Sequence, residues 1–351
     1  MADTGAGAEA ELDYPFDSLP SGEPTELAPG LLVVPIPVPF PPGTISCVML
    51  DDGDGWTLVD TGLRLDDTKA LWRQLLGGAF AEKPLKRVIA THHHPDHIGL
   101  AGWFQREYGA ELWTTRTAWL FARMLQLDAW ETPPQEAELF HRRCGYDAEM
   151  LARWRERAMR NFSVTVEPLP LGVRTFGEGA RLVAGGREWR VLFGHGHAPD
   201  HALLWCEAEK IVLAGDQVLP RITPNIGVYA TEPEADPLGD WIESCARLAE
   251  TLDDDLLIVP GHGDPFRGAR RRLRTVLAKH QRSLDRLETH LERPRTVIEC
   301  FPVLYRRQIT APLEGLATVE TVAHLNRLWH EGRARRRMRA DGVYEWERVN
   351  V

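Results

Sequence analysis

Long apolar runs are missing from this 351-residue sequence. It has no stretch of about 18 consecutive apolar residues, which excludes an ordinary membrane-spanning helix. The N-terminal stretch is acidic and lacks the basic and then apolar layout of a secretory signal. We therefore expect a cytoplasmic protein with no membrane association.

Paired cysteines are missing as well. The five cysteines are odd in number, scattered and without a C-x-x-C pair, which fits a reducing compartment. We expect each of them to be a small buried apolar residue. They are Cys47, Cys144, Cys206, Cys245 and Cys300.

The composition is otherwise that of a globular chain, with 43% hydrophobic and 26% charged residues. The length indicates one large domain and a smaller one. Charge is unevenly distributed, since residues 265–351 hold 19 Lys or Arg and 10 Asp or Glu although the whole chain carries −10. The chain as a whole is therefore poorly suited to nonspecific nucleic-acid binding.

The most informative segment is residues 91–97, Thr-His-His-His-Pro-Asp-His. It contains the pattern H-x-H-x-D-H, formed by His92, His94, Asp96 and His97. Such a segment is costly to bury without partners, whereas imidazole and carboxylate are good ligands for zinc and similar metals. It follows residues 87–90, a short apolar run that predicts a buried strand.

Three further apolar runs lead into glycine and then a potential ligand. Residues 191–193 precede His197, residues 211–214 precede Asp216, and residues 256–259 precede His262. Glycine allows a tight turn where a ligand must be aimed. A chance run of surface histidines would not explain the repetition, so the pattern favours a metal site at strand ends.

These elements, together with Val59-Asp60-Thr61-Gly62, occur in an order that resembles the metallo-β-lactamase superfamily over roughly residues 30–265. The resemblance implies an α/β fold, an αββα sandwich of two mixed β-sheets flanked by helices. It implies that Asp60 supports the metal ligands from beside them. It also implies a ligand set in which His92, His94 and His197 hold one metal, Asp96, His97 and His262 hold a second, and Asp216 bridges the two.

The implied cofactor is a pair of divalent ions per chain. Zinc is favoured, with manganese or iron left open, because His94 stands where the family's redox branch often has Glu. Asp96 is the candidate catalytic residue, able to orient the attacking hydroxide or take its proton. His93 should turn away from the ligands, and His201 could either support the site or contact substrate.

Two segments could shape the substrate pocket. Residues 115–162 predict a helical insertion, whose aromatic and methionine residues could cover the site or simply pack in the core. Residues 217–236 form a long loop after Asp216, and such loops often carry function. Arg221, Asn225 and Tyr229 are candidate substrate contacts there, with ordinary loop packing as the alternative.

We divide the chain into a mobile acidic tail over residues 1–28, a catalytic domain over 29–265 and a basic domain over 266–351. Strands are expected at 31–38, with prolines typical of an edge, and at 44–50 and 56–59, followed by a helix at 66–76. Helices at 270–291, 296–306 and 318–331 and a hairpin around Asp341-Gly342 resemble a winged-helix module found in the lactamase-β-like branch.

Some members of that branch cleave single-stranded RNA, which gives a second hypothesis. Basic winged helices can bind phosphates, and the hairpin segment offers Arg333, Arg335, Arg336, Arg337 and Arg339. These arginines could instead pair with the acidic catalytic domain or simply lie solvated at the surface, which we favour.

The sequence thus predicts a dinuclear metal-dependent hydrolase that uses a metal-bound hydroxide on a small ester, thioester or lactone. The alternatives are a single-strand endoribonuclease and a noncatalytic binding protein on the same fold. The expected partner is a small-molecule substrate; RNA is less favoured, and a homo-oligomer is left open.

Overall fold

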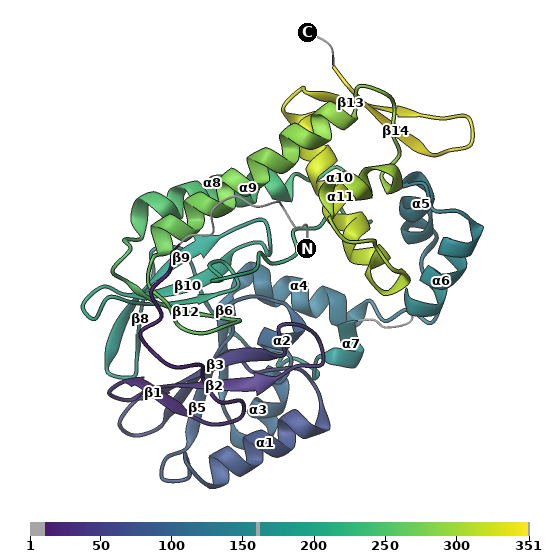
Figure 1. The fold of residues 1–351 in the computed structure, drawn as a ribbon. Helices are drawn as coiled ribbons and strands as arrows, with labels where there is room; N and C mark the ends of the chain where they lie inside the picture. Colours follow the sequence, from purple (N-terminus) through teal and green to yellow (C-terminus); the bar gives the residue numbers. More distant parts are fainter. Residues whose placement is uncertain (1–10, 159–161, 350–351) are drawn as a thin grey trace.

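The computed structural model describes residues 11–158 and 162–349 of the chain. Two mixed β-sheets pack face to face, and helices cover the outer face of each (Figure 1). This arrangement confirms the predicted αββα sandwich. The insertion and the C-terminal elements lie together at one end of the sandwich (Figure 1).

The first sheet has seven strands in the order of the sequence. Neighbours from β1 to β4 are antiparallel, and those from β4 to β7 are parallel. The strands are β1 (Thr25–Ala28), β2 (Leu31–Pro37), β3 (Thr44–Asp51), β4 (Trp56–Val59), β5 (Leu85–Ile89), β6 (Glu111–Thr115) and β7 (Arg174–Phe176).

The second sheet has five strands in the order β12-β11-β10-β9-β8. Only β11 and β12 are parallel. The strands are β8 (Arg181–Ala184), β9 (Arg187–Gly194), β10 (His201–Cys206), β11 (Ile211–Gly215) and β12 (Leu257–Pro260).

Alternation along the strands builds the layers, because successive side chains of a strand point to opposite faces. In β2, Leu31 and Val33 enter the core between the sheets, whereas Val34 and Ile36 enter the core under the helices of the first sheet. Those helices include α1 (Asp66–Gly77), α3 (Ala101–Tyr108) and α4 (Arg116–Leu127), and α8 (Pro237–Thr251) and α9 (Ala269–His290) cover the second sheet.

The prolines of β2 have a simple place in this sheet. Strand β1 pairs only with residues 31–33 of β2, so Pro35 and Pro37 lie beyond it and have β3 as their one neighbouring strand. A proline without an N–H is tolerated on such an open side. The expected edge position therefore holds for the second half of β2, which has a neighbouring strand on one side only.

The C-terminal segment shares its core with the catalytic sheet. It contains α9, α10 (Phe301–Leu304), α11 (Glu314–His330) and the hairpin of β13 (Ala334–Met338) and β14 (Tyr344–Arg348). One buried cluster joins Val212 of β11, Leu273 of α9, Leu325 of α11 and Trp346 of β14. The expected three helices and hairpin are present, although the middle helix is shorter than 296–306 and the last begins earlier, at Glu314.

The insertion packs against this C-terminal segment. It contains α4, α5 (Gln135–Arg143), α6 (Ala148–Ala158) and α7 (Phe162–Thr165), while its residues 159–161 lie outside the described residues. Tyr146 and Thr318 join their hydroxyl groups at 2.9 Å, and Arg153 forms an ion pair with Glu314 at 2.9 Å. Helices α5 and α6 accordingly stand beside α11 (Figure 1).

The mobile tail is expected over residues 1–28, but the structure shows that residues 12–14 and 25–28 are packed or paired with the rest of the protein. Residues 1–10 lie outside the described residues, but Leu12 and Tyr14 pack on the core and Asp13 pairs with Arg267 by backbone hydrogen bonds. Residues 25–28 form β1. Apolar side chains among the acidic and glycine residues anchor this segment.

All five cysteines are buried and unpaired, as the sequence predicts. Among the described residues, no helix is both long and apolar enough to cross a membrane.

Candidate metal centre

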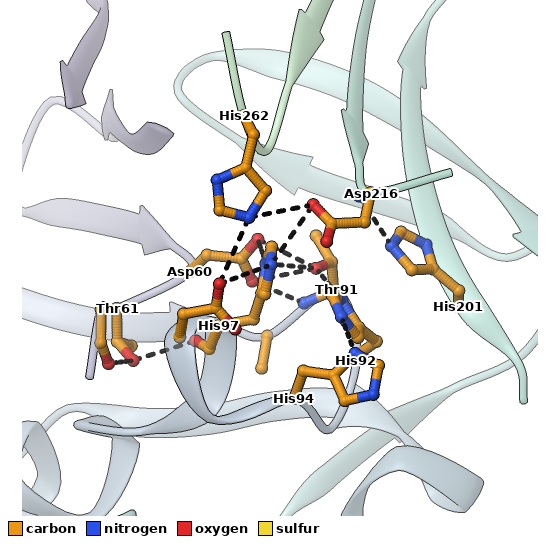
Figure 2. A network of polar contacts seen from close by, with 12 residues as sticks. Asp60, Thr61, Thr91, His92, His94, His97, His201, Asp216 and His262 are labelled. Atoms are coloured by element: carbon orange, nitrogen blue, oxygen red, sulfur yellow. Dashed lines mark hydrogen bonds and ion pairs between the residues drawn. The ribbon is translucent and has the colours of Figure 1, made fainter. Parts of the chain in front are cut away.

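The predicted ligands meet where strands of both sheets end (Figure 2). Strand β5 ends at Ile89 and leads to His92 and His94, after which the short helix α2 (Pro95–Ile98) carries Asp96 and His97. His197, Asp216 and His262 follow β9, β11 and β12. The four apolar runs thus bring their polar residues to one point from separate strands.

Three imidazoles form the first group. The Nδ1 atom of His94 lies 2.9 Å from the Nε2 atom of His92 and 2.9 Å from the Nε2 atom of His197. These three residues form a set that could hold a metal ion.

A second group surrounds the Nε2 atom of His97. It lies 3.8 Å from Oδ2 of Asp96 and 3.4 Å from Oδ1 of Asp216. The Nε2 atom of His262 lies 3.2 Å from the same Asp96 oxygen. Asp96, His97 and His262 form a further possible metal-binding set.

Asp216 lies between the two groups. Its Oδ2 atom is 3.4 Å from Nε2 of His197, and its Oδ1 atom is 3.4 Å from Nε2 of His97 and 3.7 Å from Nε2 of His262. Each carboxylate oxygen thus faces a different group, which is the arrangement expected of a bridging ligand.

Hydrogen bonds from the far side of each ring aim its other nitrogen inward. His197 Nδ1–H donates to the carbonyl of Asn225 at 2.8 Å, and His262 Nδ1–H donates to that of Thr44 at 2.6 Å. A carbonyl only accepts, so both rings present an Nε2 lone pair to the centre. Partners of this kind fix the tautomer and orientation of metal-binding histidines.

Asp60 supports His97 in the same way. Its Oδ2 atom accepts from Nδ1–H of His97 at 2.8 Å, and its Oδ1 atom accepts from the backbone N–H of Thr91 at 2.8 Å. The Thr91 hydroxyl donates to Asp60 at 2.9 Å and therefore accepts from His92 Nδ1–H at 3.0 Å. Asp60 itself has a φ of 60°, which is uncommon for a residue with a side chain.

Glycine is required at two points of this framework. A Cβ atom on Gly261 would lie 2.4 Å from Oδ1 of Asp216, and one on Gly215, whose φ is 46°, would lie 2.6 Å from the ring of His201. Both glycines follow the predicted pattern of an apolar run, glycine and ligand. They allow the backbone to approach the ligands closely.

The ionisation of the imidazoles differs between the two groups. Burial, followed by neighbouring imidazoles, holds the pKa values of His92 and His94 well below the usual range. Burial also opposes charge on His97, but the carboxylates of Asp60, Asp216 and Asp96 outweigh it and raise the pKa of His97 well above that range. His92 and His97 are buried and His94 is half-buried, and with two inward carboxylates these imidazoles make a strongly ligating environment.

The donor set fits a metal cofactor. Among the described residues, the Nε2 atom of His97 and the Oδ1 atom of Asp216 have no hydrogen-bond partner although both are buried. The Nδ1 atom of His94 has nitrogens of two other rings at 2.9 Å, although a single proton could serve only one of these contacts. A cation at each group would satisfy these atoms, because buried polar groups need partners.

Two histidines near the ligands have other surroundings. The Nε2 atom of His201 accepts from the backbone N–H of Asp216 at 3.0 Å, and its ring stacks on that of His92 with centroids 4.5 Å apart. It therefore holds ligands in place. His93 belongs to none of the possible metal-binding sets and lies against Phe121, with ring centroids 5.3 Å apart.

A cavity of 560 Å³ adjoins the first group of imidazoles, with His94 and His197 in its wall. Tyr229 lines it, and the side chain of Asn225 accepts from the Tyr229 hydroxyl at 3.5 Å. Arg221 is not part of its wall and instead lies over Tyr14, 5.8 Å from the ring centroid. Of the three expected substrate contacts, Tyr229 lines the cavity, Asn225 contacts His197 through its carbonyl without lining the cavity, and Arg221 lies outside it.

Sequence reasoning missed several supporting groups. The carbonyls of Thr44 and Asn225 carry no side-chain signal, and their roles depend on distant segments meeting. The hydroxyl of Thr91 was detectable in principle, because it directly precedes the H-x-H-x-D-H pattern.

The comparisons with known proteins agree with this geometry. The family model described as "Metallo-beta-lactamase superfamily" matches residues 40–262, and the model described as "Metallo-beta-lactamase-like, C-terminal domain" matches residues 284–349. A solved structure of a beta-lactamase domain protein from Burkholderia ambifaria is 35% identical, with a TM-score of 0.89, over 97% of this chain and 98% of that one.

Two curated relatives carry functional names. "Probable metallo-hydrolase YqjP" of Bacillus subtilis is 27% identical over 84% of this chain and 91% of its own length. "Hydroxyacylglutathione hydrolase GloC" of Haemophilus influenzae is 26% identical over 51% of this chain and 69% of its own length.

Proposed function

Since the chain belongs to the metallo-beta-lactamase superfamily and is a metallo-hydrolase, we propose that it cleaves a small ester, thioester or lactone with two metal ions, zinc being favoured. The observation that carries this proposal is the double cluster joined by Asp216, with three ligands on either side. The two ions would be held by His92, His94 and His197 on one side and by Asp96, His97 and His262 on the other, with Asp216 between them.

When bound, two divalent ions held by these residues would supply a water of lowered pKa and would polarise the oxygen of the scissile group. Asp96 is buried at the cluster, and its Oδ2 atom lies 3.2 Å from His262. We assign it a second role, in which its carboxylate orients the attacking water and accepts a proton. Asp60, Thr91 and His201 keep the ligands in one orientation, which limits the reorganisation needed during the reaction.

A thioester is within the range of this chemistry, and the Haemophilus influenzae relative is named for hydrolysis of an acylglutathione. The RNA hypothesis has less support. Arg335 and Arg337 of the hairpin pair with Glu347 and Glu345, and Arg336 pairs with Glu234. Of these arginines, Arg336 pairs with the catalytic domain, as the favoured alternative expects, whereas Arg335 and Arg337 pair within the hairpin itself.

The proposal is tested by assaying the zinc-loaded protein on a panel of esters, thioesters, lactones, phosphodiesters and short RNAs. We expect hydrolysis of at least one carboxylic substrate, its loss after dialysis against a chelator and its return with zinc. Close to two metals per chain should be found by elemental analysis. Turnover of RNA alone, or full activity with no metal or one metal per chain, would contradict the proposal.

A further inference from the structure

The walls of the cavity beside the metal centre come from separate parts of the chain. Phe121, Met124 and Leu125 come from α4, Phe140 from α5, and Phe162 from α7. The loop after Asp216 supplies Val228 and Tyr229, and Val319 of α11 completes the wall. The insertion and the C-terminal segment therefore both contribute to this cavity.

The wall of the cavity is mostly apolar. Its described residues include no lysine or arginine, and its carboxylates are Glu232 and Asp240. Aromatic and aliphatic side chains make up most of the rest. Away from His94 and His197, where the proposed metals would lie, such a wall favours an uncharged apolar group over phosphate or another anion, because no lysine or arginine of the wall would compensate the charge of the anion.

The cavity also has the size and position of a substrate site. Its 560 Å³ lie within the range of small-molecule pockets, roughly 300–1,000 Å³. His94 and His197 of the first imidazole group stand in its wall, so a group bound there has its end at the proposed metals. His93 lies at the same end between His94 and Phe121, with ring centroids 4.6 Å and 5.3 Å away.

We propose that this cavity binds an apolar, uncharged acyl chain of the substrate, so that the enzyme prefers esters or thioesters of medium-length aliphatic acids. The inference rests on the proposed hydrolysis of carboxylic substrates and specifies the acid part. Met124 is a specificity-determining residue, because it lies in the wall yet is 40% exposed at the cavity edge.

Binding is tested first, without turnover. The probes are 1-butanol, 1-octanol and octanoate, and their affinities for the zinc-loaded protein are measured by calorimetry. We expect 1-octanol to bind more tightly than 1-butanol. Met124→Trp should weaken 1-octanol binding several-fold by filling the cavity. Met124→Arg should shift the preference towards octanoate.

The matched control is Leu127 on the same helix, which is 73% exposed and is not part of the wall. Leu127→Trp and Leu127→Arg should leave all three affinities unchanged. Equal binding of the two alcohols by the wild type, or equal effects of the Met124 and Leu127 variants, would overturn the inference.

A second measurement uses esters of straight-chain acids from acetate to decanoate. We expect kcat/KM to rise by a factor of about three to four per methylene until the cavity is filled, and Met124→Trp to shorten the preferred chain. Hydrolysis without any dependence on chain length would overturn the inference and leave the proposed function standing. Chain-length-dependent binding of the alcohols without hydrolysis of any ester, thioester or lactone would support the apolar chain site and contradict the proposed function.

Discussion

Asp60 connects two ligands to the backbone of the strand that precedes them. Its carboxylate accepts from His97 and from both the N–H and the hydroxyl of Thr91, which in turn contacts His92. A carboxylate behind a metal-binding imidazole increases the basicity of the ring and fixes its direction. In the proposed metal site, Asp60 would therefore act on the metal through residues that it touches.

Replacing Asp60 by Asn should weaken metal binding while the fold remains. The amide has the size of the carboxylate but no charge, and loss of such a partner costs roughly 10–100-fold in metal affinity. Competition with a chromophoric zinc chelator measures the effect. Asp67→Asn, on the exposed side of α1, is the control and should bind zinc as the wild type does. Equal affinities of the Asp60 and Asp67 variants would show that Asp60 does not support the ligands.

Asp96 and His93 are three residues apart and should respond differently to truncation. Asp96→Ala removes a ligand and the proposed proton acceptor, so kcat should fall by at least the roughly 10²–10⁴-fold typical of general acid–base groups. His93→Ala should mainly raise KM, because His93 lines the cavity and belongs to no metal-binding set. Circular dichroism checks the fold, and steady-state kinetics separate kcat from KM. A similar loss of kcat in both variants would refute this division of roles.

The hairpin of β13 and β14 is tied to the loop that walls the cavity. Arg336 lies over the rings of Tyr344, Trp329 and Trp346, with centroid distances of 4.3 Å, 4.8 Å and 5.5 Å, and pairs with Glu234 at 2.5 Å. Helix α11 holds the same loop, since Asn326 donates to the carbonyls of residues 233 and 235. The C-terminal segment therefore positions a wall of the proposed substrate site.

Arg336→Met should lower Tm by a few degrees and raise KM, with little change in kcat. The guanidinium is largely buried, and its aromatic contacts and ion pair together contribute on the order of 2 kcal/mol. Arg335→Met is the matched control from the same strand. Arg335 points outward and pairs with Glu347 at an exposed position, where such pairs contribute about 0–1 kcal/mol. Thermal unfolding and kinetics of both variants test this, and indistinguishable behaviour would contradict the positioning role.

The elements and ligands that could be predicted are those with a local signal. Apolar runs followed by a ligand located β5, β9, β11 and β12, the last three with a glycine before the ligand, because strand, turn and ligand are close together in the sequence. The helix expected at 270–291 is present as α9, but its sequence did not indicate its neighbours, the second sheet and α8. A local signal does not show which distant segments will meet. The packing of residues 11–28 therefore could not be predicted, nor could the cavity, whose walls come from segments about 200 residues apart.

The charge of the whole molecule argues against tight RNA binding. The net charge is −10, and Arg335 and Arg337 are paired with Glu347 and Glu345. Arg335→Gln combined with Arg337→Gln should therefore change the affinity for a short single-stranded RNA little, and should leave kcat/KM on a small ester unchanged. Fluorescence anisotropy at two salt concentrations measures the affinity. Tight, salt-steep binding by the wild type that disappears in the double variant would favour the ribonuclease hypothesis.

Buried neutral histidines should make the whole fold sensitive to acid. His280 of α9 lies 5.8 Å from His324 of α11, and neither ring nitrogen of His280 has a hydrogen-bond partner among the described residues. Burial, then the neighbouring His324, lowers the pKa of His280 to about 3. In the unfolded chain a histidine takes up its proton near pH ~6.5. Between these values the unfolded state binds more protons, so stability falls as the pH falls.

His280→Leu should make this loss of stability with acid shallower, by up to about 1.4 kcal/mol per pH unit below pH ~6.5. The leucine fills a similar space and has no proton to gain on unfolding. The free energy of unfolding in urea is measured at about pH 7 and at about pH 5, two conditions on either side of the ordinary histidine pKa.

His290→Leu, at the C-terminal end of α9, is the control for the loss of a histidine in general. Because both variants keep all metal ligands, acid release of metal affects them equally, and the difference between them isolates the buried pair. Parallel pH profiles of the two variants would show that His280 is not held neutral between α9 and α11.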